Sequence, residues 1–213
     1  MVKDAVVTLT GGSEFAADYA ISVAGAFGAH MAGVAFIYEP VIPDDALGGI
    51  SSNLIDIQRQ GASEELLIEG ALFGSGRPVG IVPVIQSRGL TLERVLVCWD
   101  GSRPAARAIA DAMPFLTRAK AVDILVITGE RDRSGEITGK NMRAHLARHD
   151  IQTEIKQIKG ADAQNAIQSH AAAIGADFMV MGGYHHSRLR EFILGGVTRG
   201  ILKSMTVPVF MSR

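Results

Sequence analysis

The stretch RVLVCWDGSRPAARAIADAMPFLTRAKAVDILVIT (residues 94–128) sets two short apolar runs on either side of a segment with helical spacing. The runs over 94–99 and 122–128 are rich in valine, leucine and isoleucine, which favours β-strands. Between them apolar residues recur every three or four positions, at Ala106, Ile109, Ala110, Met113 and Leu116. Buried strands that alternate with helices are typical of a parallel sheet, so this stretch predicts an α/β fold.

The same alternation continues to the end of the chain. We predict further helices over residues 135–150, 161–175 and 197–205, and further strands over residues 151–158, 177–182 and 207–212. Gly175 is expected to end the second of these helices, because glycine is common just after a helix. The whole pattern predicts a parallel five-stranded sheet of the Rossmann type, with helices on both faces.

The composition excludes several classes of protein. The chain has 213 residues, 47% of them hydrophobic and 20% charged, which is enough for a sizeable core. A net charge of −1 argues against nucleic acid as a partner. No apolar run approaches the roughly 20 residues that span a bilayer, so no membrane partner is expected. The single cysteine, Cys98, fits a reducing compartment, and we expect a cytoplasmic protein with a buried, inert thiol there.

The N-terminal part of the chain repeats the pattern of the C-terminal part. Residues 4–38 match a strand, a glycine-serine turn, an alanine-rich helix and a second strand. Two dipeptides recur in the same order, Gly12-Ser13 matching Gly101-Ser102 and Pro78-Val79 matching Pro208-Val209. We therefore predict two tandem copies of one domain, over residues 1–85 and 92–213.

The first copy is the shorter one. The residues that would form its third strand, the next helix and its fourth strand are lacking between Tyr38 and Leu66. Either evolution removed this segment, or residues are missing from the sequence near positions 60–63. In both cases the first copy is incomplete, and we predict that it serves as a structural partner of the second.

A second glycine-rich stretch, MGGYHHSRLREFILGGVT (residues 181–198), connects a predicted strand to a predicted helix. Glycines are placed where the backbone turns sharply or approaches a ligand closely. Main-chain N–H groups and the helix dipole at this place could bind phosphate. The alternative is that the glycines serve two tight loops and nothing else.

These motifs resemble those of the universal stress protein family, in its tandem, two-copy form. That family carries G-x2-G-x9-G-[ST] between its fourth strand and its last helix. Here the run starts at Gly182, has His185 in place of the second glycine, and ends at Gly195-Gly196. The segment VCWDGS (residues 97–102), in which Asp100 ends the first strand, also fits. The resemblance covers residues 92–213 strongly and 2–83 weakly.

The resemblance implies a strand order of 3-2-1-4-5 and ATP, with any Mg²⁺ that it carries, at the carboxyl ends of strands 1 and 4. Open parallel sheets also bind ligands where the strand order reverses. By resemblance Asp100 contacts the adenosine end and Ile127 lines the adenine pocket. The remaining binding residues implied are Gly182, His185, Gly195, Gly196, Val197 and Thr198.

Three features of the expected site leave alternatives open. His185 either obstructs the nucleotide or donates a hydrogen bond to phosphate. Thr198 either supplies a hydroxyl or caps the last helix. The adjacent His185 and His186 lack a cysteine or carboxylate at ligand spacing, so we expect no metal bound by the protein itself. Ser102 lacks the sequence context of a hydrolase nucleophile and is expected to cap the following helix.

The resemblance implies a stress-response protein that binds ATP in its second copy and acts as a nucleotide-dependent regulatory or interaction module. The alternative is a nucleotide-free dimerisation module of the same family. No catalytic base is evident, so the sequence favours a binding protein over an enzyme and leaves slow ATP hydrolysis open.

The last strands of the two copies are edge strands that should pair with each other, burying Val79, Ile81, Val207 and Val209. We expect two such chains to form a homodimer.

Overall fold

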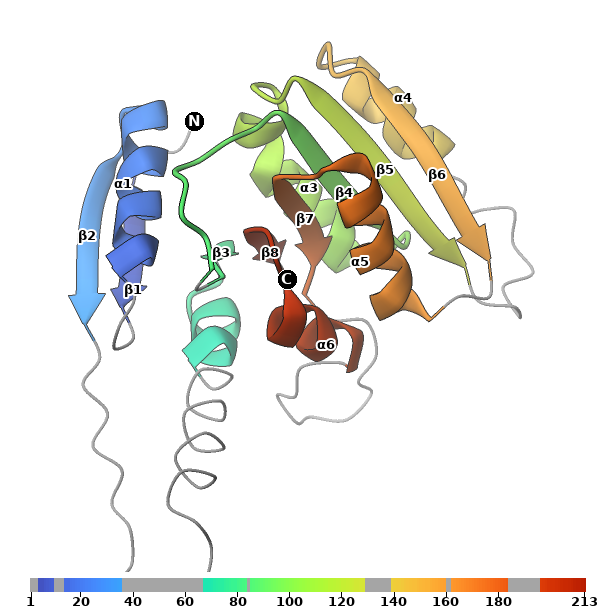
Figure 1. The fold of residues 1–213 in the computed structure, drawn as a ribbon. Helices are drawn as coiled ribbons and strands as arrows, with labels where there is room; N and C mark the ends of the chain where they lie inside the picture. The colour runs from blue at the N-terminus through green and yellow to red at the C-terminus, as the bar shows by residue number, and fades with distance from the viewer. Residues whose placement is uncertain are drawn as a thin grey trace, which may run out of the picture.

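In the computed structural model the chain forms one large sheet, a smaller strand pair and the helices that cover them (Figure 1). The structure describes residues 4–9, 14–35, 67–83, 85–128, 139–159, 162–183 and 196–213. No helix in these ranges is both long enough and apolar enough to span a membrane. The expected deletion between Tyr38 and Leu66 lies outside the described residues.

The large sheet has six strands in the order β3-β8-β7-β4-β5-β6. Its strands are β3 (Val79–Ile81), β4 (Arg94–Trp99), β5 (Ala121–Thr128), β6 (Thr153–Lys159), β7 (Phe178–Gly182) and β8 (Val209–Ser212). Strand β4 lies in the centre and pairs in parallel with both β5 and β7. The five strands β4 to β8 are all parallel and confirm the predicted order 3-2-1-4-5.

The sixth strand comes from the N-terminal part of the chain. β3 runs antiparallel to β8, with Val79 opposite Met211 and Ile81 opposite Val209. This confirms that the two segments pair within one chain, and it extends the predicted five-stranded sheet by one strand. Val209 is fully buried, whereas Val79, Ile81 and Val207 are only partly buried.

The expectation that β3 is the edge of a sheet of its own copy is wrong. β1 (Asp4–Leu9) and β2 (His30–Ala35) form a separate parallel pair, and β3 is not part of it. β4 and β8, the first and last strands of the second copy, correspond to β1 and β3 of the first. In the large sheet β7 lies between β4 and β8. No described residue before position 79 supplies such an intervening strand, so β3 pairs with β8 alone.

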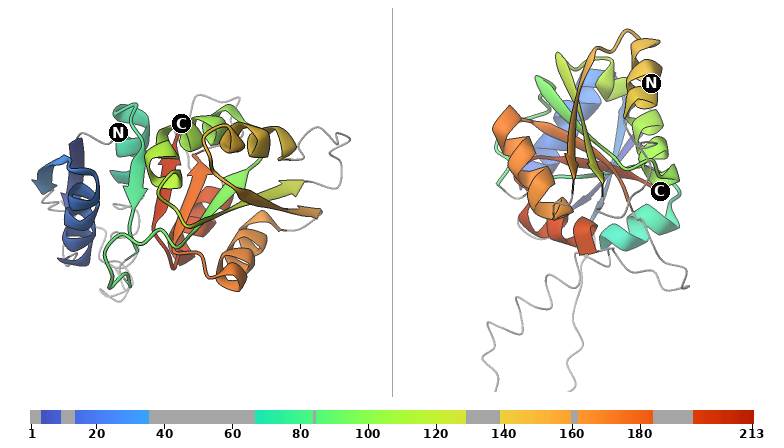
Figure 2. Two further views of the ribbon diagram at one scale, coloured as in Figure 1. Left: turned by 90° about the horizontal axis from the view of Figure 1, so that it is seen from above. Right: turned by 90° about the vertical axis from the view of Figure 1, so that its right-hand side faces the viewer.

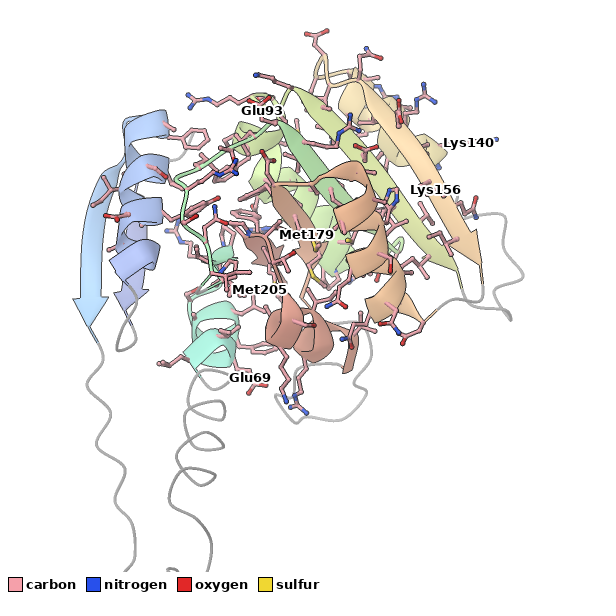
Figure 3. The ribbon with its side chains drawn as sticks, viewed as in Figure 1. Glu69, Glu93, Lys140, Lys156, Met179 and Met205 are labelled. Carbon is pink, nitrogen blue, oxygen red and sulfur yellow. The ribbon has the colours of Figure 1, made fainter. Side chains whose placement is uncertain are left out.

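Helices cover both faces of the large sheet, as the right-hand view of Figure 2 shows. One face packs against α3 (Arg103–Leu116) and α4 (Lys140–Ala147), and the other against α5 (Ala163–Ile174) and α6 (Gly196–Ser204). Side chains alternate along each strand, so successive residues of β4 contribute to opposite cores. Figure 3 shows Met179, a member of the α5 and α6 core, in the interior, while Lys140 and Lys156 lie at the outer edge of the sheet.

Local sequence signals determine where two of these helices begin and end. The hydroxyl of Ser102 accepts a hydrogen bond from the amide of Ala105 at 3.1 Å, which confirms that Ser102 caps α3. The carboxylate of Asp162 caps α5 in the same way, accepting from the amide of Gln164 at 3.0 Å. Gly175 ends α5 in the left-handed conformation, with φ of 65°, as its position in the sequence predicts.

The N-terminal strand pair depends on its helix for attachment to the rest of the molecule. Helix α1 (Glu14–Phe27) joins β1 to β2 and ends with Phe27, which is buried against Phe115 of α3 at 4.9 Å between ring centroids. The guanidinium of Arg118 stacks on the same ring at 4.1 Å. A two-stranded sheet is marginal by itself, so this docking stabilises it.

The β3–β8 pairing predicts a strong effect of proline at Val209. Proline has no N–H, and β8 has a paired strand on each side, so Val209→Pro removes a ladder donor. Val209→Ala is the matched control, because it removes the same side chain but keeps the amide. We expect the proline variant to melt at a clearly lower temperature than the alanine variant, because a buried group left without its hydrogen-bond partner costs about 1–3 kcal/mol. Equal melting temperatures would contradict the pairing of β8 on both sides.

The docking of α1 predicts that Phe27→Ala loosens the N-terminal segment. The change removes the ring contacts with Phe115 and Arg118, which is expected to cost about 3–5 kcal/mol. Limited proteolysis should then cut within α1 while residues 94–212 stay resistant. Ile21→Ala is the control, since Ile21 lies in the same helix but is exposed. Uniform resistance of the Phe27 variant would show that α1 is held by other contacts.

Candidate functional site

The candidate site lies at the edge of the sheet where the parallel strands β4, β5 and β7 end. Because β4 pairs with β5 on one side and β7 on the other, the strand order reverses at this point. Asp100 follows β4 directly, Gly182 is the last residue of β7, and Ile127 is the second-to-last residue of β5. The sequence therefore identified residues that the fold brings to one edge.

Asp100 organises the turn between β4 and α3. Asp100 is exposed, and its carboxylate accepts a hydrogen bond from the amide of Ser102 at 2.9 Å. Gly101, between them, has φ of 77°, a conformation that side chains disfavour. One oxygen of the Asp100 carboxylate thus fixes the backbone of the turn, while solvent can still reach the carboxylate.

Gly182 is required by close packing against α3. A Cβ at this position would lie 2.5 Å from the amide nitrogen of Ala105 and 2.8 Å from the carbonyl carbon of Pro104. Only glycine lets the end of β7 approach the first turn of α3 so closely. Contacts therefore run from Asp100 through Ser102 and Ala105 to Gly182, and they hold the ends of β4 and β7 together.

The first turn of α6 contains Gly196, Val197 and Thr198, which differ in their surroundings. Gly196 is exposed, and a Cβ added there would meet no described residue within 4 Å. Val197 is 41% exposed, whereas Thr198 is 5% exposed. Thr198 is the third residue of α6, so the interpretation that it caps this helix is wrong. The open part of the turn is formed by Gly196 and Val197.

Apolar residues lie beneath this edge of the sheet. Ile127 is partly buried and packs against the core that α5 and α6 cover, as do Cys98 of β4 and Ile158 of β6. Burial raises the pKa of the Cys98 thiol to about 12, and the nearby Asp100 carboxylate contributes to this shift. A thiol whose pKa is raised in this way favours its protonated, less reactive form at neutral pH. Cys98 is partly buried rather than fully buried as expected.

The remaining expected residues, His185 and Gly195, lie outside the described residues. Residues 129–138 and 184–195, which adjoin the site in the sequence, are all outside them. Among the residues that are described, no three histidine, cysteine, aspartate or glutamate side chains are grouped as metal ligands.

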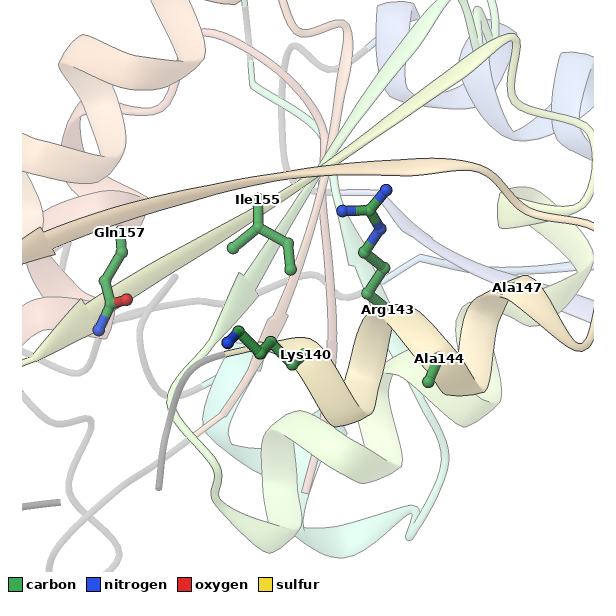
Figure 4. Close-up of a pocket in the computed structure, with 6 residues that line it drawn as sticks. All are labelled: Lys140, Arg143, Ala144, Ala147, Ile155 and Gln157. Atoms are coloured by element: carbon green, nitrogen blue, oxygen red, sulfur yellow. The ribbon is translucent and has the colours of Figure 1, made fainter. Parts of the chain in front are cut away.

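A groove that the sequence did not predict lies at the β6 edge of the large sheet, between α4 and β6 (Figure 4). Its volume is about 550 Å³, and Lys140 and Arg143 of α4 face Ile155 and Gln157 of β6 across it. None of the expected ATP residues that the structure describes lines it. The helix and the strand that form the groove are consecutive in sequence. Helical periodicity alone could have predicted that the two basic residues of α4 lie on one face of that helix.

The comparison with known protein families decides the family of the chain. Residues 91–213 match the universal stress protein family. The chain belongs to this family. Membership supports a role in the stress response, and the match begins just before β4 and covers the whole candidate site. No curated protein matches the chain.

Two solved structures share the fold over nearly the entire chain. A universal stress protein from Archaeoglobus fulgidus DSM 4304 is 19% identical with a TM-score of 0.58, covering 99% of this chain and 88% of its own. A functionally unknown protein from Pseudomonas aeruginosa PAO1 is 15% identical with a TM-score of 0.59, covering 98% of this chain and 92% of its own.

The contrast between Gly182 and Gly196 predicts opposite results for the same substitution. Gly182→Ala forces a Cβ against the backbone of Ala105, and overpacking of this kind costs about 1–3 kcal/mol. Gly196→Ala meets open space at the start of a helix and should change the free energy of unfolding by less than about 1 kcal/mol. Urea denaturation measures both. A Gly182 variant as stable as wild type would mean that β7 and α3 can separate easily.

Proposed function

We propose that the chain is a tandem universal stress protein whose second copy, residues 92–213, binds ATP. In this proposal residues 1–85 are a shortened first copy that serves as a structural partner. The observation that carries the ATP proposal is the series of contacts from Asp100 to Gly182 at the point where the strand order reverses. An accessible carboxylate there suits the adenosine end of a nucleotide.

The first turn of α6 supports a phosphate position. The early N–H groups of a helix lack partners within it, and the helix dipole favours an anion there. No described residue lies within 4 Å of the position that a Cβ of Gly196 would take, which is consistent with a phosphate reaching the backbone there. Thr198 is buried, so any hydroxyl contact would come from elsewhere.

The tandem arrangement has separate support. β3 and β8 occupy equivalent places in the two sequence repeats, and they pair antiparallel to each other. The Archaeoglobus protein, which is of the same family, has this fold over 99% of the chain, including the N-terminal segment. We further propose that two chains associate as a homodimer, and that the protein is cytoplasmic, since its only cysteine is unpaired.

One observation favours the rival proposal of a nucleotide-free interaction module. Gly182 has a packing reason of its own, so the glycine motif does not require a phosphate. Mass analysis of small molecules released from heat-denatured, freshly purified protein separates the two. ATP in near-equal amount to protein favours the first proposal. Its absence, together with no binding in a titration with ATP, favours the rival.

The ATP proposal predicts that Asp100→Ala and Gly195→Val both weaken binding. The first removes a polar contact, worth about tenfold in affinity, and the second blocks the approach of backbone to phosphate. Calorimetric titration with ATP measures both variants. Asp18→Ala is the control, because Asp18 is an exposed carboxylate on α1, outside the proposed site.

Melting without ATP should show that each variant is folded. If wild type binds ATP and both variants bind it equally well, the nucleotide lies elsewhere. If only Gly195→Val binds like wild type, the proposed phosphate position is wrong while the contact with Asp100 stands.

A further inference from the structure

A second groove, with a volume of about 340 Å³, lies beside β8 and is lined by none of the described residues that are proposed for ATP. Three arginines line it: Arg77 just before β3, Arg107 on α3, and Arg213 just after β8. We call it the arginine groove. Its floor includes Leu72, which belongs to the buried core, and its wall includes Phe73.

Two of the three arginines are held in place by neighbours. The Nε of Arg107 donates to the carboxylate of Asp111 at 2.8 Å, and the hydroxyl of Ser212 donates to the same carboxylate oxygen at 2.9 Å. The guanidinium of Arg213 stacks on the ring of Phe73 at 4.3 Å from its centroid. Each contact leaves the terminal N–H groups of the arginine available as donors.

Arg77 is positioned by the backbone. It follows Gly76, whose φ is 60°, and its amide donates to the hydroxyl of Ser75 at 3.1 Å. It forms no ion pair with any residue that the structure describes. The side chains lining the groove therefore carry three positive charges and a single negative one, that of Asp111.

We infer that the arginine groove binds a small phosphate monoester. Such a group carries a charge of about −1.5 to −2 near neutral pH, which matches the excess positive charge of the lining side chains. Guanidinium groups present paired donors that suit phosphate oxygens. The volume lies at the lower end of the range for small-molecule sites, about 300–1,000 Å³. Leu72 and Phe73 supply the apolar part of the lining, which suits the organic part of the ligand.

The groove depends on two distant segments of the chain. Leu72, Phe73 and Arg77 come from the π-helix η2 (Gly70–Gly74) and the turn after it, whereas the other side is built by α3 and the end of β8. The β3–β8 pairing holds the two sides together. A bound phosphate monoester therefore links residues 67–83 to the rest of the molecule, and it should stabilise that attachment by mass action.

Titration calorimetry with phenyl phosphate at constant ionic strength tests the inference. Arg77→Gln and Arg213→Gln should each weaken binding by about tenfold or more, since each removes charge-assisted hydrogen bonds. Arg143→Gln, which removes an exposed arginine of α4, is the matched control and should bind like wild type. Arg77 is exposed, so its variant should melt like wild type without ligand.

Several outcomes would overturn the inference. One is no binding of phenyl phosphate to wild type at about 10 mM, and another is equal binding by the Arg77, Arg213 and Arg143 variants. Benzoate that binds as tightly as phenyl phosphate would exclude selection for phosphate. Asp100→Ala should leave phenyl phosphate binding unchanged, whatever it does to ATP. Loss of binding in that variant, with Arg77→Gln unaffected, would move the phosphate to the proposed ATP site.

Discussion

The middle of strand β4 is buried on both faces, and the rest of the sheet is arranged around this constraint. Val95 and Val97 face the core under α3 and α4, Leu96 faces the core under α5 and α6, and all three are fully buried. A strand buried on both faces needs neighbours on both sides and helices above and below. Those helices return the chain so that β4, β5 and β7 run in parallel. Parallel strands end at a common edge, and there the order of the strands reverses.

At that edge a single glycine-rich motif serves more than one purpose. Gly182 is fixed by the backbone of α3, which would collide with any side chain, so it shapes the site by bringing two elements together. Gly196 begins α6 as the structure describes it, and a Cβ there would meet no described residue within 4 Å. Interpreting the whole motif as a phosphate loop would miss this difference between the two glycines. The packing role requires no ligand, whereas the open turn of α6 offers one a place.

Among the described residues, the N-terminal segment is attached both through α1 and through residues 67–83, which lie far apart in its sequence. Phe27 packs into the core beside Phe115, and β3 covers the outer edge of β8. An uncovered apolar edge invites pairing with other chains, and here the chain itself provides the covering strand. The same pairing brings η2 and Arg77 close to α3, so the arginine groove exists only because the two segments are joined.

The sequence by itself determined the alternation of strands and helices after residue 94, because strands buried on both faces appear as short apolar runs. It also determined the cap at Ser102 and the end of α5 at Gly175, since both depend on bonds within a few residues. Together with the family resemblance it indicated the strand order and the pairing of β3 with β8. Only the tertiary structure decided that β3 has no sheet of its own, that Gly182 is held by Ala105, and that three arginines share a groove. Each of these rests on contacts between residues far apart in the chain, and no local pattern of residue types encodes such contacts.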